Sequence, residues 1–306
     1  MKKVTRWISF FLACTFLITT FTACSTHSYT ESQMSHVISA ADVSQYIGAD
    51  GVVIVDMQSP EEYAASHLEG AVNIPSSDIV INVPVQNMIT SKKKIEGIMG
   101  ENGISNDTLV IAYDTDRMSA ARLLWTLFMY GFENVQVVSG GFDAIKAAGL
   151  PVGTAAPAVT AATFTAAEPT AEWNVDMKRV REQVDTPSEG VVLLDVRSEE
   201  EYQTEGKIPT AVMRNYTECY REDGTLYPKE LTRIHFKEAG IYPEDEIIIY
   251  CRSSFRAAPV FLQLYEAGYR NIKLYDGAFL EWTSHADNPV ELPEGAAPAP
   301  TQKDAS

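Results

Sequence analysis

The stretch EIIIYCRSSFRAAP, residues 246–259, places a cysteine between an apolar run and a candidate helix. Residues 246–250 are mostly β-branched or aromatic and predict a buried strand, and the amphipathic pattern of residues 257–268 predicts a helix. Because a helix start presents backbone N–H groups without intrahelical partners, the intervening loop, residues 251–256, is expected to bind an anion.

The chemistry of this loop depends on its cysteine. Arg252 and Arg256 add positive charge beside Cys251, so we expect its thiol to ionise below the free pKa of about 8.5 and to act as a nucleophile. The alternative is a buried cysteine that serves as a small hydrophobic residue. The expected substrate-binding residues are Arg252, Ser253, Ser254, Phe255 and Arg256, together with Arg197 upstream. One of the two serines has the alternative role of helix N-cap.

Composition sets the broad class. The chain has 306 residues, 45% of them hydrophobic and 21% charged, which predicts globular material in two domains. A net charge of −17 argues against nucleic acid as a partner. The five histidines form no close cluster with the four cysteines, so no metal site and no cofactor are predicted.

The N-terminus reads as a targeting segment. Residues 1–6 are basic, residues 7–21 are apolar but too short for a usual membrane-spanning helix, and small residues precede Cys24. This order resembles the lipobox of bacterial lipoprotein signal peptides. The resemblance implies removal of residues 1–23, lipidation of Cys24, and an exported protein anchored to the extracytoplasmic side of a membrane. Ordinary secretion, or release into a periplasm, is the alternative, and an uncleaved anchor is a third.

The rest of the chain is an internal repeat. Residues 191–195 (VVLLD) match residues 52–56 (VVIVD), and further on identical residues recur 137 positions apart. These pairs are Tyr113 and Tyr250, Gly131 and Gly268, Asn134 and Asn271, Gly140 and Gly277, and Phe142 and Phe279. Strands alternate with helices in both copies, including an amphipathic helix expected over residues 117–130. The pattern predicts two α/β domains, each a mainly parallel sheet with helices on both faces.

Composition shifts predict the boundaries of these domains. The polar residues 24–36 read as a tether, and the Ala-, Thr- and Pro-rich residues 153–170 read as a linker over the surface with little to bury. The domains are then residues 37–152 and 171–290. The final residues, 291–306, rich in Ala and Pro, are expected to be a disordered tail.

The repeat also compares the two candidate loops. At the offset of 137 positions, Asp114 is the counterpart of Cys251. A carboxylate cannot form a persulfide by the same route. The first domain is therefore predicted to be catalytically silent, with Asp114 as a cap for the helix that follows it.

Together these features resemble the tandem-domain rhodaneses, the thiosulfate and 3-mercaptopyruvate sulfurtransferases. In the first half the resemblance rests on Asp56, on residues 67–75 (HLEGAVNIP), on Tyr113-Asp114, on residues 119–122 with Trp125, and on Gly140-Gly141. In the second half it rests on Asp195-Val-Arg197, Ile208-Pro209, residues 251–256 and Tyr275-Asp276-Gly277. The family implies a silent first domain and an active second domain.

Loop length distinguishes the related chemistries. Four residues separate Cys251 from Arg256, whereas cysteine phosphatases have five at this point. The smaller ring of amides favours one sulfane sulfur over a tetrahedral phosphate. A cationic loop, and Glu201 where long tandem enzymes commonly carry an arginine that holds a carboxylate, favour thiosulfate over 3-mercaptopyruvate.

The predicted activity is sulfur transfer through a Cys251 persulfide to cyanide or a thiol. The alternatives are a persulfide carrier or anion-binding module without turnover and, third, a cysteine phosphatase. Arg197 either lines the pocket or braces the strand end with Asp195. Cys219 lies in a polar segment and is expected to be a passive thiol, with a disulfide to Cys251 as the alternative.

Overall fold

The computed structural model describes residues 35–293, and these residues belong to one compact unit. The expected signal segment, residues 1–23, and residues 24–34 and 294–306 of the expected tether and tail lie outside this range. Within residues 35–293, no helix is both long and apolar enough to cross a bilayer.

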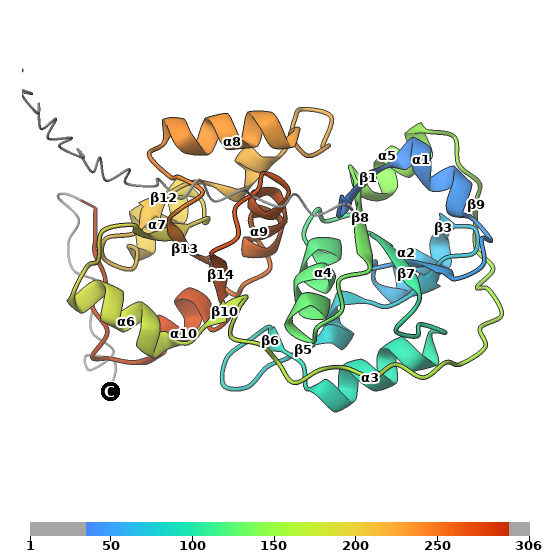
Figure 1. Ribbon diagram of the computed structural model, residues 1–306, viewed down its shortest axis with the longest axis horizontal. Coiled ribbons are helices and arrows are strands. Elements are labelled where there is room, and N and C mark those ends of the chain that lie inside the picture. Colours follow the sequence, from blue (N-terminus) through green and yellow to red (C-terminus); the bar gives the residue numbers. More distant parts are fainter. Residues whose placement is uncertain (1–34, 294–306) are drawn as a thin grey trace, which may run out of the picture. The chain divides into compact units, whose positions relative to one another are not determined.

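The first half is built on a five-stranded parallel sheet with the order β1-β8-β7-β2-β4 (Figure 1). Its strands are β1 (Val37–Ser39), β2 (Val52–Asp56), β4 (Val72–Asn73), β7 (Leu109–Tyr113) and β8 (Val135–Ser139). Its helices are α1 (Ala40–Val43), α2 (Pro60–Ala65), α3 (Lys92–Glu101), α4 (Ser119–Met129) and α5 (Gly141–Ala147). Two short antiparallel pairs complete it, β3 (His67–Leu68) with β9 (Val152–Gly153) and β5 (Val80–Ile81) with β6 (Met88–Ile89).

The second half repeats this sheet, in the order β10-β14-β13-β11-β12. Its strands are β10 (Asn174–Val175), β11 (Val191–Asp195), β12 (Val212–Met213), β13 (Glu246–Tyr250) and β14 (Ile272–Tyr275). Its helices are α6 (Met177–Asp185), α7 (Glu199–Glu205), α8 (Lys229–Glu238), α9 (Ala257–Glu266) and α10 (Ala278–Ser284). Each strand occupies the place of its counterpart, which confirms the predicted fold class.

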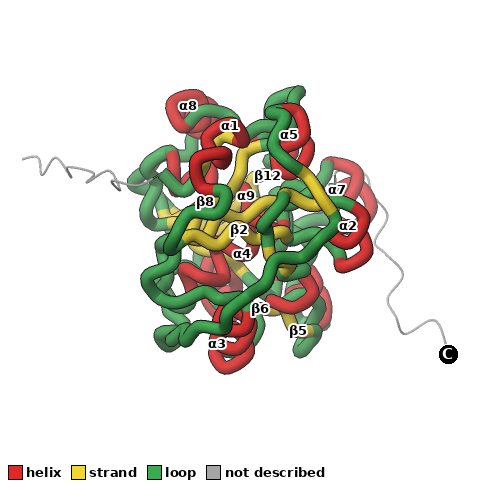
Figure 2. Tube along the Cα trace, turned by 90° about the vertical axis from the view of Figure 1, so that its right-hand side faces the viewer, coloured by secondary structure: helices red, strands yellow, loops and turns green. Residues whose placement is uncertain are grey.

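Alternation along the central strands builds a core on both faces of each sheet. In β13, Ile247 and Ile249 face the cluster that contains α8 and α9, while Ile248 and Tyr250 face the cluster that contains α6 and α10. The strand β7 alternates in the same way between α4 and the α1–α5 face. Figure 2 shows the strands as a yellow layer among the red helices. Burial on both faces explains why the strands read as continuous apolar runs.

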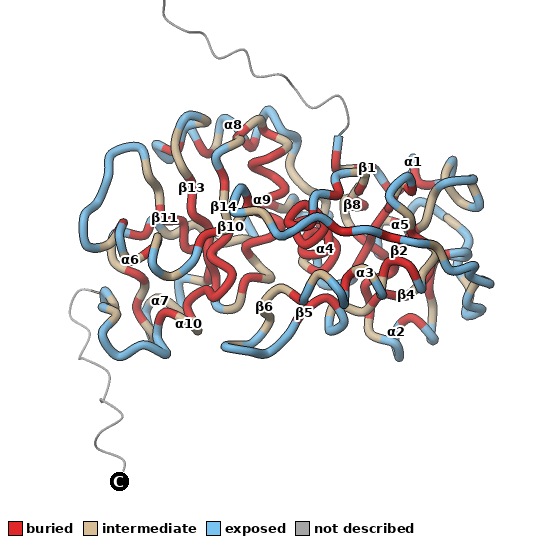
Figure 3. The backbone as a smooth tube through the Cα atoms, turned by 60° about the horizontal axis from the view of Figure 1, so that its bottom comes forward, coloured by how far each residue is buried: buried red, intermediate tan, exposed pale blue. Residues whose placement is uncertain are grey.

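Helices α4 and α9 differ from the sequence expectation of an amphipathic pattern. All residues of α4, and all residues of α9 except Glu266, are buried (Figure 3). One side of each helix packs on its own sheet, and the other side packs against its counterpart in the other half. Phe128 of α4, for example, meets Phe261 and Tyr265 of α9 edge to face. A helix buried on both sides has no polar face to show.

The linker also differs from expectation, because it buries side chains. Phe164 and Ala166 are 4% and 3% exposed and join the core of the first half. The linker backbone is fixed as well, since the Ala167 and Thr170 N–H groups donate to carbonyl oxygens at the end of α4. Low hydrophobicity of the segment as a whole concealed two apolar anchors in it.

Candidate functional site

Cys251 lies at the carboxyl edge of the second sheet, directly after β13. Strands β11 and β13 are paired in register, with Asp195 opposite Tyr250, so the residues that follow these two strands meet at one edge. The Cys251 side chain is buried, at 1% exposure, and the Cys251 carbonyl oxygen accepts a hydrogen bond from the Phe279 N–H of α10 at 3.0 Å. The thiol is thus held at the base of the loop that leads into α9.

The serines of this loop shape it from opposite sides. Ser254 has φ +67°, and its hydroxyl donates to the carbonyl oxygens of Tyr275 and Asp276 at 3.1 and 2.9 Å. The Ser253 hydroxyl accepts a hydrogen bond at 2.9 Å from the Asn87 side-chain amide of the first half. Neither serine is the N-cap of α9, contrary to the alternative drawn from the sequence, because that helix has no side-chain cap.

Arg256 is held by a glutamate. Its two terminal nitrogens donate to the two carboxylate oxygens of Glu201 at 2.5 and 2.7 Å. Burial opposes a charge on Arg256, but the bond to Glu201 and the charge of Cys251 raise its pKa above the ordinary value. Although burial opposes ionisation of Glu201 too, the hydrogen bond from Arg256 lowers its pKa to about 2. The pair is therefore ionised at neutral pH.

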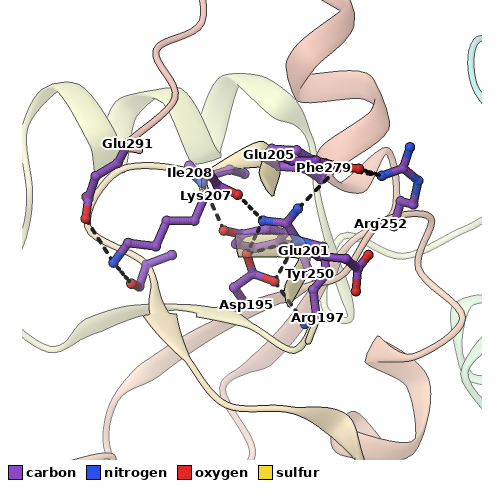
Figure 4. Close-up of polar contacts among 12 residues, drawn as sticks. Asp195, Arg197, Glu201, Glu205, Lys207, Ile208, Tyr250, Arg252, Phe279 and Glu291 are labelled. Atoms are coloured by element: carbon purple, nitrogen blue, oxygen red, sulfur yellow. Dashed lines mark hydrogen bonds and ion pairs between the residues drawn. The ribbon is translucent and has the colours of Figure 1, made fainter. Parts of the chain in front are cut away.

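Arg252 is paired in the same way, as Figure 4 shows. Its Nη1 donates to both carboxylate oxygens of Glu205 at 2.5 Å. Glu201 and Glu205 are one helical turn apart on α7, so they lie on the same side of that helix. The two arginines that the sequence marks as anion ligands thus each face a carboxylate.

Arg197 sits deeper than the loop arginines. Its guanidinium is fully buried, donates to the Asp195 carboxylate and to the Gly206 carbonyl oxygen, and lies 3.7 Å from the Phe279 ring centroid. Burial opposes its charge, but the Asp195 carboxylate raises its pKa. Of the two roles left open by the sequence, this geometry favours the brace at the strand end.

The first half contributes contacts that the sequence gave no sign of. Arg122 of α4, fully buried, donates through Nη2 to Asp276 at 2.7 Å and to the Asn87 carbonyl oxygen at 2.9 Å. The second Asp276 oxygen accepts from the Ile89 N–H of β6 at 2.8 Å. Asn87 and Ile89 belong to the β5–β6 hairpin. Because Asn87 also reaches Ser253, this hairpin ties the first half to the cysteine loop.

The equivalent loop of the first half is closed by its own contacts. Asp114 accepts hydrogen bonds from the Arg117 and Ala120 N–H groups at 3.1 and 2.9 Å, so it does cap the start of α4. Burial raises the pKa of Asp114 to about 7, with the charge of Asp116 acting in the same direction. Arg117 has φ +62°, as Ser254 has 137 positions later, and its carbonyl oxygen accepts from the Tyr220 hydroxyl. The two loops thus share a backbone form but differ in side chains.

Comparison with known proteins identifies this arrangement. The sequence profile of the Rhodanese-like domain matches residues 39–148 and 176–285, which is one domain in each half. The chain belongs to the rhodanese family. A thiosulfate sulfurtransferase of Azotobacter vinelandii is 27% identical to this rhodanese over 268 residues, covering 84% of this chain and 97% of the relative.

Solved structures agree on the fold of this rhodanese. The crystal structure of YnjE, named a thiosulfate sulfurtransferase in Escherichia coli, superposes with a TM-score of 0.75 at 24% identity, over 85% of this chain and 68% of that one. An anaerobic ergothioneine biosynthesis enzyme from Chlorobium limicola, in complex with trimethyl histidine, gives a TM-score of 0.76 at 22% identity, over 84% of this chain and 70% of that one.

The second thiol of this rhodanese is remote from such chemistry. Cys219 is 3% exposed and packs in the main core, and burial raises its pKa to about 12. Both Cys219 and Cys251 are free thiols. The geometry favours the passive role for Cys219. Among residues 35–293 there is also no group of three or more His, Cys, Asp or Glu side chains placed to hold a metal ion.

Proposed function

We propose that this rhodanese moves sulfane sulfur from thiosulfate, in preference to 3-mercaptopyruvate, through a persulfide on Cys251 to a thiophilic acceptor such as cyanide or a thiol. The observation that supports this proposal most strongly is the position of Cys251. It begins a short, strained loop at the carboxyl edge of a parallel sheet, between β13 and α9, in a chain of the sulfurtransferase family. Asp114 at the same place makes the first domain the silent one.

The proposed reaction has two displacement steps. The Cys251 thiolate attacks the outer sulfur of thiosulfate, the S–S bond of thiosulfate breaks, and sulfite leaves with the bonding pair. The acceptor then attacks the outer sulfur of the persulfide, and the Cys251 thiolate is the leaving group. Cyanide becomes thiocyanate, and a thiolate becomes a persulfide, with no external oxidant or reductant. The charges balance in both steps.

The loop supplies the electrostatics of both steps. Backbone N–H groups of residues 252–256 hold the negative charge of the persulfide, as an oxyanion hole holds oxygen. Arg256 is the nearer of the two cations, because its pKa responds to the charge of Cys251. Ser253, Ser254 and Phe255 complete the wall of the loop, with Arg252 at its half-exposed end.

Turnover of the mature protein tests the proposal. We expect thiocyanate to form from thiosulfate and cyanide, and to be lost in Cys251→Ser, while Cys219→Ser keeps the activity. Single-turnover labelling of Cys251 without turnover would favour a persulfide carrier instead. Hydrolysis of an aryl phosphate without sulfur transfer would favour phosphatase chemistry.

We also propose export of the chain, with lipidation of Cys24 and attachment to the extracytoplasmic side of a membrane. The support is the order of basic, apolar and small residues before Cys24. Mass spectrometry of the N-terminal peptide from the native host tests it. An acylated Cys24 is expected, and a chain that still begins at Met1 would refute it.

A further inference from the structure

Helix α7 brings negative charge to the cysteine loop. Its sequence, EEEYQTE, holds four glutamates and no basic residue. The helix starts directly after the Asp195–Arg197 brace, and Asp195 is paired with Tyr250, the residue before Cys251. The local fold therefore fixes this acidic helix beside the nucleophile.

The two glutamates nearest the loop neutralise its two arginines. Glu201 binds Arg256 with both oxygens, and the two side chains are 21% and 22% exposed. Glu205 binds Arg252, and its carboxylate also lies 3.6 Å from Nη1 of Arg197. The two cations and two anions sum to zero.

The rest of the surroundings adds no free positive charge. Arg197 is compensated by Asp195, and the Arg122 side chain by Asp276. The remaining glutamates of α7, Glu199 and Glu200, are exposed at its first turn. An approaching anion thus meets paired arginines and an acidic rim, whereas a cation meets carboxylates.

We propose that Glu201 and Glu205 set the charge selectivity of the Cys251 site, disfavouring dianions such as thiosulfate and favouring a sulfur acceptor that carries a positive charge, such as an aminothiol. This inference rests on the proposed sulfur transfer for the identity of the acceptor. The transfer itself is balanced, because the thiolate of the aminothiol takes the outer sulfur of the persulfide and Cys251 leaves as a thiolate. Thiosulfate remains a donor, with weak affinity.

The competing explanation is that Glu201 only orients Arg256 for an anionic substrate. The two ideas predict opposite results for Glu201→Gln. Glutamine keeps the length of the side chain and can keep the capping box with Ser198, so the change removes the charge and leaves the helix start intact. If the glutamate only orients Arg256, thiosulfate binding weakens. If it competes with the anion, thiosulfate binding improves.

The first experiment measures turnover. In Glu201→Gln/Glu205→Gln, KM for thiosulfate should fall about tenfold, in line with the loss of about 1.4 kcal/mol of repulsion. The preference for cysteamine over 3-mercaptopropionate as acceptor, a cation and an anion of similar size, should fall by a similar factor. Glu200→Gln removes the same charge from the same helix without freeing an arginine, and should change each value less than twofold. A raised KM for thiosulfate in the double variant would overturn the inference.

The second experiment does not need sulfur transfer. Cys251 is labelled with two methanethiosulfonates, one bearing ethyltrimethylammonium and one bearing ethylsulfonate, and peptide mapping gives the rate at Cys251 alone. Relative to free 2-mercaptoethanol, the protein should favour the cation about tenfold or more, and the double variant should lose this preference. No preference, or no reaction with either reagent, would overturn the inference, since burial and not charge would then govern approach.

The two experiments separate the two proposals. Charge-selective labelling without any turnover refutes the proposed sulfur transfer and leaves the role of α7 standing. Turnover without charge selectivity does the reverse.

Discussion

The buried ion pair between Arg122 and Asp276 gives the sharpest stability prediction. The two side chains are 0% and 2% exposed and join the first domain to the second. Within the described residues, Nε and Nη1 of Arg122 have no hydrogen-bond partner, and the guanidinium lies 4.4 Å from the Trp125 ring centroid. The change Arg122→Met keeps most of the apolar volume but leaves the Asp276 carboxylate with only the Ile89 N–H.

The expected loss follows from that unpaired carboxylate. Removing one partner of a buried pair costs about 3–5 kcal/mol, and we expect about 3 kcal/mol because Asp276 keeps one hydrogen bond. The matched control is Arg179→Met. Arg179 and its partner Glu246 are 29% and 16% exposed, so its loss should cost about 1 kcal/mol or less. Urea unfolding followed by tryptophan fluorescence measures both changes.

A double-mutant cycle with Asp276→Asn tests the cause. Once the carboxylate is neutral, Arg122→Met should cost less, with a coupling energy of about 1–3 kcal/mol. Sulfur transfer should also slow in Arg122→Met, because Asn87 loses a donor and its amide holds Ser253. Equal losses in Arg122→Met and Arg179→Met, or strict additivity in the cycle, would refute the reasoning.

Three further predictions follow from single contacts. Asn87→Gly permits the φ of +66° but removes the amide bonded to Ser253, so kcat for thiocyanate formation should fall severalfold while the urea midpoint changes little; an unchanged kcat would show that the contact is idle. The pKa of Asp114 is raised from 3.8 to about 7, so the folded state binds its proton more tightly, and stability should decline as pH rises through that window, by at most about 4 kcal/mol for three pKa units; urea unfolding of Asp114→Asn at pH 4 and 7 should show a weaker decline, and the same slope as in the parent would contradict the assignment. Cys219 in the folded protein should resist iodoacetamide, since its thiol is 3% exposed with a pKa of about 12; rapid alkylation found by mass spectrometry would exclude the passive role.

Much of the fold was predictable because it is written locally. Continuous apolar runs marked the strands of both sheets, and the 137-residue offset predicted that the sheets would match. The offset extends to backbone detail, since Gly141 and Ala278 share a positive φ of +57° and +55°. The complete burial of α4 and α9 was not predictable in this way. Periodicity reports one apolar stripe per helix, and it contains no information on a second partner in the other domain.

The site was predictable to the level of its nucleophile and no further. The position of Cys251 after β13 follows from a strand and a helix that are adjacent in sequence. The charge around it does not, because Glu201 and Arg256 are 55 positions apart and only the pairing of β11 with β13 brings them together. The sequence therefore presented two free arginines where the structure has two ion pairs.

The contacts of the first domain explain how a domain without a cysteine remains part of the site. Arg122 and Asn87 do not touch Cys251, yet they hold Asp276 and Ser253 on two sides of its loop. Ser254 is fixed by the Asp276 carbonyl oxygen as well, so the left-handed turn of the loop depends on a residue anchored by the other domain. A strained loop keeps its shape only where its surroundings determine it. Replacing the nucleophile with Asp114 removes one thiol from the chain, whereas losing the first domain would remove the support for the thiol that remains.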